Sequence, residues 1–397
     1  MRISTSAIHE NALSAMMKQQ ATLSATQNQI ATGKRVQSPA DDPVASVHIL
    51  ELQRALQESE QYDANSKTAQ SRLNLEEQAL ADVGNLITQV NEKALQGNNA
   101  TVDAASRKMI AVEIRQRLSE LMEIANRKDA NGEYLFAGYS TLTQPFSQTG
   151  SSVSYFGDQG SRQLQVSSTA KVSDSHSGYQ LFMQVPQGNG TFVTAASSTN
   201  TGTGVIGVGS VVNPTAWVPD DYTLSFTSAT GDYQIVDSAS NVITTGTYTA
   251  GSAISFNGVN IDLAGMPASG DTFTISRSRT EDVFTTLGKL ADALEGNGVG
   301  STAQFNSEMG QILQQLDQAT NHVLGVRAEV GARLSSLDNA DASREEMQVE
   351  LKTMKSNLQD LDYADAITKM NQQLLGLQAA QASYSKIAQL SLFDYLR

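Results

Sequence analysis

The sequence predicts a mainly α-helical protein with a β-rich insert, in which both ends of the chain form one elongated antiparallel coiled-coil bundle. The first observation is the distribution of proline, which is absent from residues 44–144 and 268–397. The second is the stretch from Tyr134 to Thr280, which contains no glutamate, one lysine and 17 of the 29 glycines. Because proline breaks helices whereas glutamate and lysine favour them, this pattern indicates helical arms around a small inserted β domain.

The third observation is a heptad repeat in the C-terminal arm. Alternate steps of 4 and 3 residues visit 17 positions, of which all but Arg333 and Arg344 are apolar. The positions are Phe305, Met309, Ile312, Leu316, Ala319, Val323, Val326, Val330, Arg333, Leu337, Ala340, Arg344, Met347, Leu351, Met354, Leu358 and Leu361. A repeat sustained over 57 residues is typical of a coiled-coil helix, about 85 Å long at a rise of about 1.5 Å per residue.

The N-terminal arm offers the partner helices that such a repeat needs. One apolar seam is interrupted only by Glu76; it comprises Ala69, Leu73, Leu80, Val83, Ile87, Val90 and Ala94. A second seam comprises Ile110, Ile114, Leu118, Leu121 and Ala125. Between them, the segment Gly97-Asn98-Asn99 followed by Thr101 to Asp103 predicts a turn and a helix N-cap.

Each end of the chain is expected to form a separate helix of about 30 residues, joined to the bundle by a hinge. The N-terminal stripe is Leu13, Met16, Leu23 and Ile30, and the C-terminal stripe includes Ile367, Met370, Leu374, Leu377 and Tyr384. Gly33 and the run Ser38-Pro39-Ala40-Asp41-Asp42-Pro43 end the first helix, whereas Asp362 and Asp365 precede the last one. We expect the two stripes to face each other.

A single buried stripe per helix offsets little of the conformational entropy that ordering the helix costs. Residues 1–40 and 362–397 are therefore expected to be mobile in the monomer and ordered by neighbouring subunits, as in a polymerising protein.

The middle of the chain shows strand alternation. Tyr222, Leu224 and Phe226 alternate with polar residues, and Asn257-Gly258 between two apolar runs predicts a β-hairpin. The predicted divisions are 1–37 (terminal helix), 38–139 (bundle), 140–204 (hairpins and linker), 205–280 (β domain), 281–361 (long C-terminal helix) and 362–397 (terminal helix).

Composition argues against several classes of function. A formal charge of -14 argues against binding nucleic acid or an anionic membrane, and the absence of cysteine excludes thiolate chemistry.

The G-x-G-x-x-G match at residues 202–207 lacks a following helix and is interpreted as a flexible linker. The four histidines are scattered, and the pairs Asp41-Asp42 and Asp220-Asp221 are interpreted as turns and caps. We expect no catalytic site, cofactor or metal.

Four segments carry a resemblance to a known family. They are RISTS at 2–6, LSATQNQIATGKRVQSPADDPVAS at 23–46, NGEYLFAGY at 131–139 and SLFDYL at 391–396. Both ends resemble the flagellin superfamily, and the whole set is similar to the hook-associated protein 3 family of hook–filament junction proteins. The motif residues are Ser38, Pro39, Asp41, Asp42 and Pro43, with Tyr134, Leu135, Phe136 and Gly138. The resemblance covers residues 1–147 and 281–397.

The resemblance implies a secreted, extracellular structural subunit of the bacterial flagellum rather than an enzyme. It implies export through the flagellar type III channel, and partners in hook-associated protein 1, flagellin and further copies of the chain in a ring. It also implies an export chaperone at the C-terminal helix, on Ile367, Met370, Leu374, Leu377 and Tyr384. The alternatives are a filament-forming flagellin, and an enzyme or adhesin that uses the β insert.

Overall fold

The computed structural model describes residues 5–296 and 300–389. The chain forms two compact units, one of residues 1–64 with 340–397 and the other of residues 65–339. The boundary therefore lies inside two long helices and not at the hinge expected near residues 38–43 and 362. No described helix is long and apolar enough to cross a membrane.

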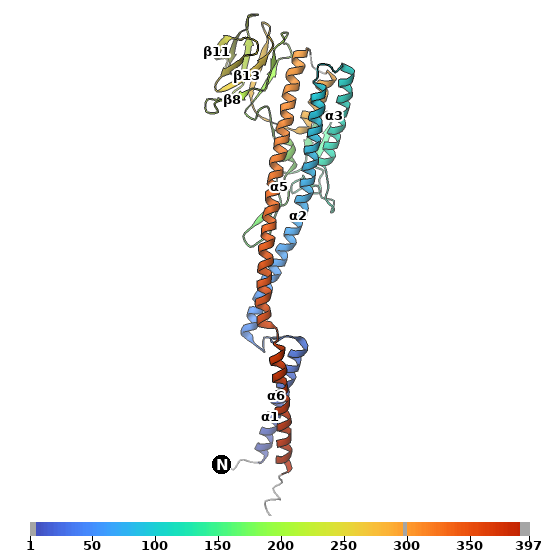
Figure 1. Ribbon diagram of the computed structural model, residues 1–397, viewed down its shortest axis with the longest axis vertical. Helices are drawn as coiled ribbons and strands as arrows, with labels where there is room; N and C mark the ends of the chain where they lie inside the picture. The colour runs from blue at the N-terminus through green and yellow to red at the C-terminus, as the bar shows by residue number, and fades with distance from the viewer. Residues whose placement is uncertain (1–4, 297–299, 390–397) are drawn as a thin grey trace, which may run out of the picture. The chain divides into compact units, whose positions relative to one another are not determined.

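The first unit pairs the two ends of the chain. Helix α1 (Thr5–Thr32) packs against α6 (Tyr363–Gln389), and Figure 1 shows the two side by side. The beginning of α2 (Pro43–Gly97) pairs with the end of α5 (Thr302–Gln359). Contacts such as Gln348 Nε2 to Ser59 Oγ, at 2.9 Å, make this pair antiparallel, as predicted.

The connections α1–α2 and α5–α6 are bonded to each other, although the sequence suggested a hinge. Arg35 N donates to Gln359 O at 2.7 Å, and Leu361 N donates to Gly33 O at 3.0 Å. Gly33 has a φ of 69°, which suits glycine at the end of a helix. Val36, Ala45 and Ile49 form a small buried cluster beneath, with Leu358 packed against it.

The C-terminal heptad is buried as predicted in the second unit, but it changes register in the first. Met347 and Met354 were expected in the seam, and their side chains are 56% and 44% exposed. Gln348 and Lys355 occupy the half-buried positions instead. Arg344 is buried, and its guanidinium lies 3.1 Å from Asp63 Oδ1. Arg344, Leu351 and Leu358 keep their predicted places, so the difference is confined to the positions that alternate with them.

The second unit contains the rest of α2 and α5 with two shorter helices, α3 (Ala104–Ala125) and α4 (Val283–Glu295). Asp103 caps α3, as predicted, by accepting a hydrogen bond from Ser106 N at 2.7 Å. The expected single helix over 281–361 is wrong, because Gly296 ends α4 in a left-handed conformation with φ 82°. This break lets α4 pack against α3 while α5 runs antiparallel to α2 (Figure 1).

A hairpin region connects α3 to the β domain. It contains β1 (Phe146–Thr149) paired with β2 (Ser152–Tyr155), and β3 (Gln163–Gln165) paired with β4 (Lys171–Ser173). A short π-helix, η1 (Tyr179–Met183), follows. The region closes with β5 (Val185–Pro186), which pairs with β15 (Thr280–Glu281) just before α4.

The β domain consists of two antiparallel sheets over one apolar core. The first sheet has the strand order β11-β10-β9-β14-β6, and the second contains β12-β13-β7 with β8 beside β13. The strands are β6 (Phe192–Ala196), β7 (Val205–Ile206), β8 (Ser210–Val211), β9 (Tyr222–Phe226), β10 (Asp232–Val236), β11 (Val242–Thr247), β12 (Ala253–Phe256), β13 (Val259–Ala264) and β14 (Thr272–Arg277). The Asn257-Gly258 hairpin is confirmed, with φ of 42° and 77°.

Two expectations about this domain need correction. Its sheet begins at Phe192 in β6, which pairs with β14, and not at residue 205. The glycine motif at 202–207 is no flexible linker, since Gly202 N donates to Asp271 Oδ2 at 3.0 Å and β7 pairs with β13. Both corrections depend on contacts between residues about 70 positions apart in the chain. Local composition gives no sign of such contacts.

We predict that excision of residues 188–278 leaves the thermal unfolding of the helices nearly unchanged. Gln187 N donates to Arg279 O at 2.8 Å, so a short glycine-serine turn can join the two ends. The β-domain core is separate from the core of the helices. Excision of 205–280 is the matched control, because it leaves β6 without β14 and exposes Phe192. Circular dichroism of both variants checks this, and early melting of the 188–278 deletion would contradict it.

Candidate functional site

The terminal helices pack through a seam that mixes polar and large apolar side chains. On α1 the seam positions are His9, Ala12, Met16, Gln19, Leu23, Thr26 and Ile30, all half-buried or buried; Ala7 and Gln29 are also half-buried. On α6 they are Ala366, Met370, Gln373, Leu377, Ala380 and Tyr384. Both sets follow the steps of 3 and 4 residues that a two-helix seam requires.

Polar contacts within this seam are only partly satisfied. Gln19 Nε2 donates to Gln373 O at 3.2 Å, and the rings of His9 and Tyr384 meet edge to face with centroids 5.7 Å apart. Gln373 Oε1 and His9 Nδ1 are buried, and neither has a hydrogen-bond partner among the described residues. Buried polar atoms without partners cost stability, so this seam is a weak one.

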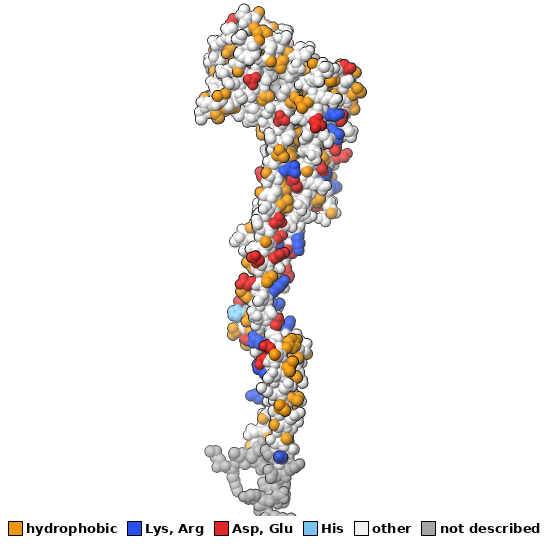
Figure 2. Space-filling view, viewed as in Figure 1, with side chains coloured by type: hydrophobic (Ala, Val, Ile, Leu, Met, Phe, Trp, Pro, Cys, Tyr) orange, Lys and Arg blue, Asp and Glu red, His pale blue; other side chains and the backbone are white. Residues whose placement is uncertain are grey.

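Several large apolar side chains of these helices lie outside the seam. Leu13 and Met17 on α1 are 46% and 57% exposed, and Ile367, Leu374 and Leu375 on α6 are 45%, 42% and 64% exposed. Figure 2 shows hydrophobic side chains on the surface of this helix pair. Soluble helix pairs normally cover such residues; here about half of the large apolar side chains stay exposed while Gln19 and Gln373 take places in the seam.

The prediction that the two apolar stripes face each other is therefore correct in part. Met16, Leu23 and Ile30 lie in the seam with Met370, Leu377 and Tyr384. Leu13, Ile367 and Leu374 lie outside it, because a shift of one residue turns a side chain by about 100° around the helix. The assembly role of all nine residues, and the mobility of the ends in the monomer, stay predictions.

The Ser38–Pro43 motif builds a turn and a helix cap. Asp41 Oδ2 accepts hydrogen bonds from Ser38 N at 2.8 Å and Gln37 N at 3.1 Å, and these bonds hold the pKa of Asp41 below its usual value. Asp42 Oδ1 accepts from Ala45 N at 3.0 Å at the start of α2, directly before Pro43. The pair is thus engaged in structure, as the sequence predicted, with Pro39 exposed beside it.

The Tyr134–Gly138 motif lies at the centre of the second unit. Leu135 and Phe136 are buried, and the Phe136 ring meets Phe182 edge to face at 5.5 Å. Gly138 has a φ of 69°, and a Cβ there would come within 2.4 Å of Asp158 O. Tyr134 stacks under the Lys128 ammonium at 4.5 Å. These residues support the fold of the hairpin region.

Asp158 and Tyr155 fix the loop around this motif. Burial acts to raise the pKa of Asp158, but hydrogen bonds from Tyr139 N and Gly160 N outweigh it and lower the pKa. Burial, with the Asp158 charge nearby, raises the pKa of Tyr155 to about 12. Its hydroxyl donates to Asp158 O at 2.7 Å.

An ion network was missed by sequence reasoning. Arg72 Nη1 lies 2.8 Å from Asp129 Oδ2 and 2.9 Å from Glu133 Oε2, and Arg72 Nε lies 3.1 Å from Asp174 Oδ2. Arg162 also contacts Asp174, at 2.7 Å. The Arg72, Asp129 and Asp174 side chains are at most 6% exposed. The network ties the hairpin region to α2, over sequence separations that no local pattern reveals.

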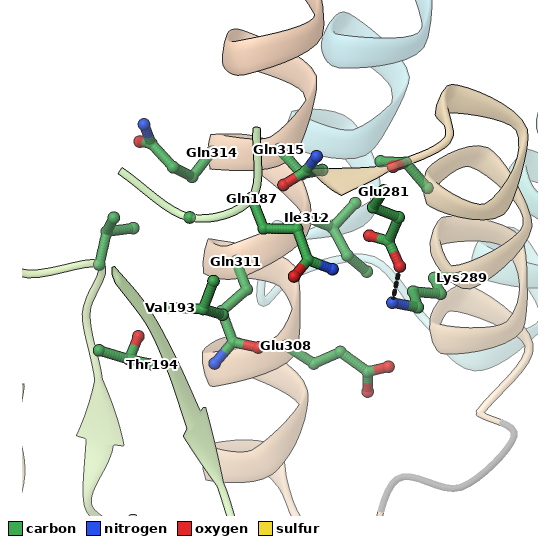
Figure 3. Close-up of a pocket in the computed structure, with 13 residues that line it drawn as sticks. Gln187, Val193, Thr194, Glu281, Lys289, Glu308, Gln311, Ile312, Gln314 and Gln315 are labelled. Atoms are coloured by element: carbon green, nitrogen blue, oxygen red, sulfur yellow. Dashed lines mark hydrogen bonds and ion pairs between the residues drawn. The ribbon is translucent and has the colours of Figure 1, made fainter. Parts of the chain in front are cut away.

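A cavity of about 200 Å³ with a mixed polar and apolar lining lies between α4, α5 and the β domain. Figure 3 shows Gln187, Gln311 and Gln315 around it, and the ion pair between Glu281 and Lys289 at its side. Burial raises the pKa of Glu308 in its wall. No histidine is among the described residues that line it. Nor do any three described His, Asp or Glu side chains form a group that could hold a metal ion.

Comparison with known proteins gives the family. Family models for the bacterial flagellin N-terminal and C-terminal helical regions match residues 3–141 and 303–396. The flagellar hook-associated protein 3 of Salmonella typhimurium is 27% identical over 398 aligned positions, which cover 100% of both chains. The crystal structure of FlgL from Xanthomonas campestris is 35% identical, with a TM-score of 0.71, and the match covers 77% of this chain and 99% of that one.

The chain belongs to the flagellar hook-associated protein 3 (FlgL) family of the flagellin superfamily. The flagellar junction protein FlgL from Legionella pneumophila agrees, at 32% identity and a TM-score of 0.71, over 79% of this chain and 99% of that one. As a member of this family, the protein is a structural component of the bacterial flagellum. Of the motif segments, residues 2–4 and 391–396 lie outside the described residues.

Proposed function

We propose that this hook-associated protein 3 family member is the adaptor that joins the hook, through hook-associated protein 1, to the flagellin filament. The names of its relatives support this role: one is a flagellar hook-associated protein 3 and another a flagellar junction protein. On this proposal the chain is exported by the flagellar type III system, acts outside the cell and is required for filament assembly and motility.

The observation that carries the proposal is the large apolar surface that the terminal helices leave exposed outside a partly polar seam. The α1–α6 seam contains Gln19, Thr26 and Gln373, whereas Met17 and Leu375 are more than half exposed. Exposed apolar side chains gain free energy when a neighbouring surface covers them, by about 25 cal/mol per Å². Neighbouring subunits in a ring of identical chains, together with hook-associated protein 1 and flagellin, are the partners that we propose for these outer faces.

An export chaperone is the second proposed partner of α6. Ile367 and Leu374 lie on one outer face of the helix, and a chaperone can cover that face before assembly in the same way. The proposal implies that chaperone binding and assembly use the same side chains in sequence. The motif residues Asp41 and Asp42 then serve assembly indirectly, by fixing the turn between α1 and α2.

Deletion of the gene in its own bacterium tests the proposed function. The expected result is cells that carry hooks without filaments and that release unpolymerised flagellin into the medium. Expression of the full chain from a plasmid should restore filaments and swimming. Electron microscopy of hooks and immunoblots of the medium measure the two outcomes. Filaments of normal length on the deletion strain would overturn the proposal.

A further inference from the structure

A buried histidine lies between two carboxylates of different helices in the second unit. His176 Nδ1 is 2.7 Å from Glu76 Oε1 on α2, and His176 Nε2 is 3.1 Å from Glu329 Oε2 on α5. The backbone N–H of His176 also donates to Glu76 Oε1, at 3.1 Å. The side chains of His176 and Glu76 are 2% and 1% exposed. The residue thus connects the segment 174–178 to both long helices.

This geometry suits a protonated imidazole between two ionised carboxylates. A neutral imidazole has one N–H and one bare nitrogen, whereas an ionised carboxylate only accepts hydrogen bonds. Both ring nitrogens can donate to Glu76 and Glu329 at the same time only in the imidazolium form. A buried carboxylate such as Glu76 also needs a cation beside it, because an isolated buried charge is very costly.

The neighbouring arginines are paired with other carboxylates, so His176 is the cation that can neutralise Glu76. On α2, Arg72 is engaged with Asp129, Glu133 and Asp174, and Glu77 is paired with Arg327 of α5. Arg333 of α5 lies 3.6 Å from Glu329, and so contacts the second carboxylate of the His176 site and not Glu76. The second oxygen of Glu76, Oε2, has no partner among the described residues. In the part of the chain that the structure describes, Glu76 thus forms its ion pair with His176.

The segment that His176 holds also covers an aromatic core. Gly178 N donates to Phe136 O at 2.8 Å, and the Phe146 ring lies so close to Gly178 that a Cβ there would be 2.7 Å from it. Phe182 follows in η1 and packs against Phe136, Phe146 and Phe284. If residues 174–178 leave α2 and α5, this aromatic cluster loses its cover.

We infer that His176 is a proton-dependent clasp. While it is protonated, its ring bonds Glu76 on α2 and Glu329 on α5 at once. When it loses its proton, one of these two bonds is lost and the segment around His176 loosens, while Asp174 stays paired with Arg72 and Arg162. The sign follows from the charges. The contribution of the clasp to stability is present at low pH and is lost as pH rises, since the neutral ring can donate to only one of the two carboxylates. The fold therefore contains a site of alkaline opening, which is separate from the terminal helices.

Hydrogen exchange of the full chain at about pH 6 and about pH 9, which bracket the ordinary titration range of histidine, tests the clasp. After correction for the intrinsic pH dependence of exchange, residues 174–178 should exchange faster at the higher pH by on the order of tenfold, as loss of a charged hydrogen bond implies. In Glu76→Gln the ring faces a neutral amide, so the pH dependence should shrink. His48→Gln is the matched control; His48 is exposed on α2 and should leave the effect intact.

NMR of histidine-labelled wild-type protein gives a second readout that does not depend on a variant that folds. The His176 ring should show both N–H protons at about pH 6 to 7, with His48 and His322 as internal references. A neutral His176 ring at about pH 6 would overturn the inference. So would exchange at 174–178 that does not depend on pH.

Discussion

Leu374→Asp is expected to block filament growth while the thermal unfolding of the isolated chain stays nearly unchanged. In the monomer the Leu374 side chain is 42% exposed on the outer face of α6, so the carboxylate remains hydrated. In the proposed junction a neighbouring subunit covers that face. Burial of an unpaired carboxylate there costs several kcal/mol per subunit, and the cost recurs in every subunit of a ring.

Gln372→Asp is the matched control for this charge. Gln372 is exposed on another side of α6, next to the Lys369–Asp365 ion pair, and its substitution should leave filaments intact. Secretion of both variants must be measured with motility, because an export chaperone can use the Leu374 face. If Leu374→Asp is secreted normally and still supports filaments, the outer face of α6 is not an assembly surface.

Arg72→Ala is expected to produce the largest loss of folding stability among single substitutions in the helical part of the second unit. The change removes the guanidinium that pairs with Asp129 and leaves Asp174 paired with Arg162. Removal of one member of a buried ion pair typically costs about 3–5 kcal/mol, since the remaining charge is uncompensated. Urea unfolding followed by circular dichroism should show a lower midpoint at unchanged slope.

Arg117→Ala provides the comparison. Arg117 pairs with Glu113 and Glu120 on the surface of α3, where such pairs contribute about 0–1 kcal/mol. A loss of stability in Arg72→Ala no larger than in Arg117→Ala would mean that the buried network is not what holds the hairpin region on α2.

The fold class was predictable because its signals are local. The presence of glutamate and the absence of proline indicate a helix from the residue types alone. A heptad repeat indicates a buried seam from the spacing of apolar residues alone. The Asp103 cap and the Asn257-Gly258 hairpin were also found this way, since each depends on two or three neighbouring residues. The break at Gly296 was missed, although glycine at the end of a helix is a known signal.

The candidate site was predictable in part. Periodicity located apolar stripes on both terminal helices, but it preferred the larger side chains for the seam. The structure instead places Gln373 in the seam and Leu374 outside it. Spacing cannot separate two stripes that are one residue apart. The choice depends on which face meets the partner helix, and here that face contains both polar and apolar side chains.

The sequence by itself determined the helical arms, the β insert and the family. Tertiary structure alone decided which charges are buried and with what partners. Glu76 was visible only as an interruption of a seam, and its reason is His176, 100 residues away. Strand β6 likewise finds its place only through β14. Long-range pairings of this kind depend on how the elements pack, because the free energy of a buried charge or a sheet edge is set by its neighbours in space.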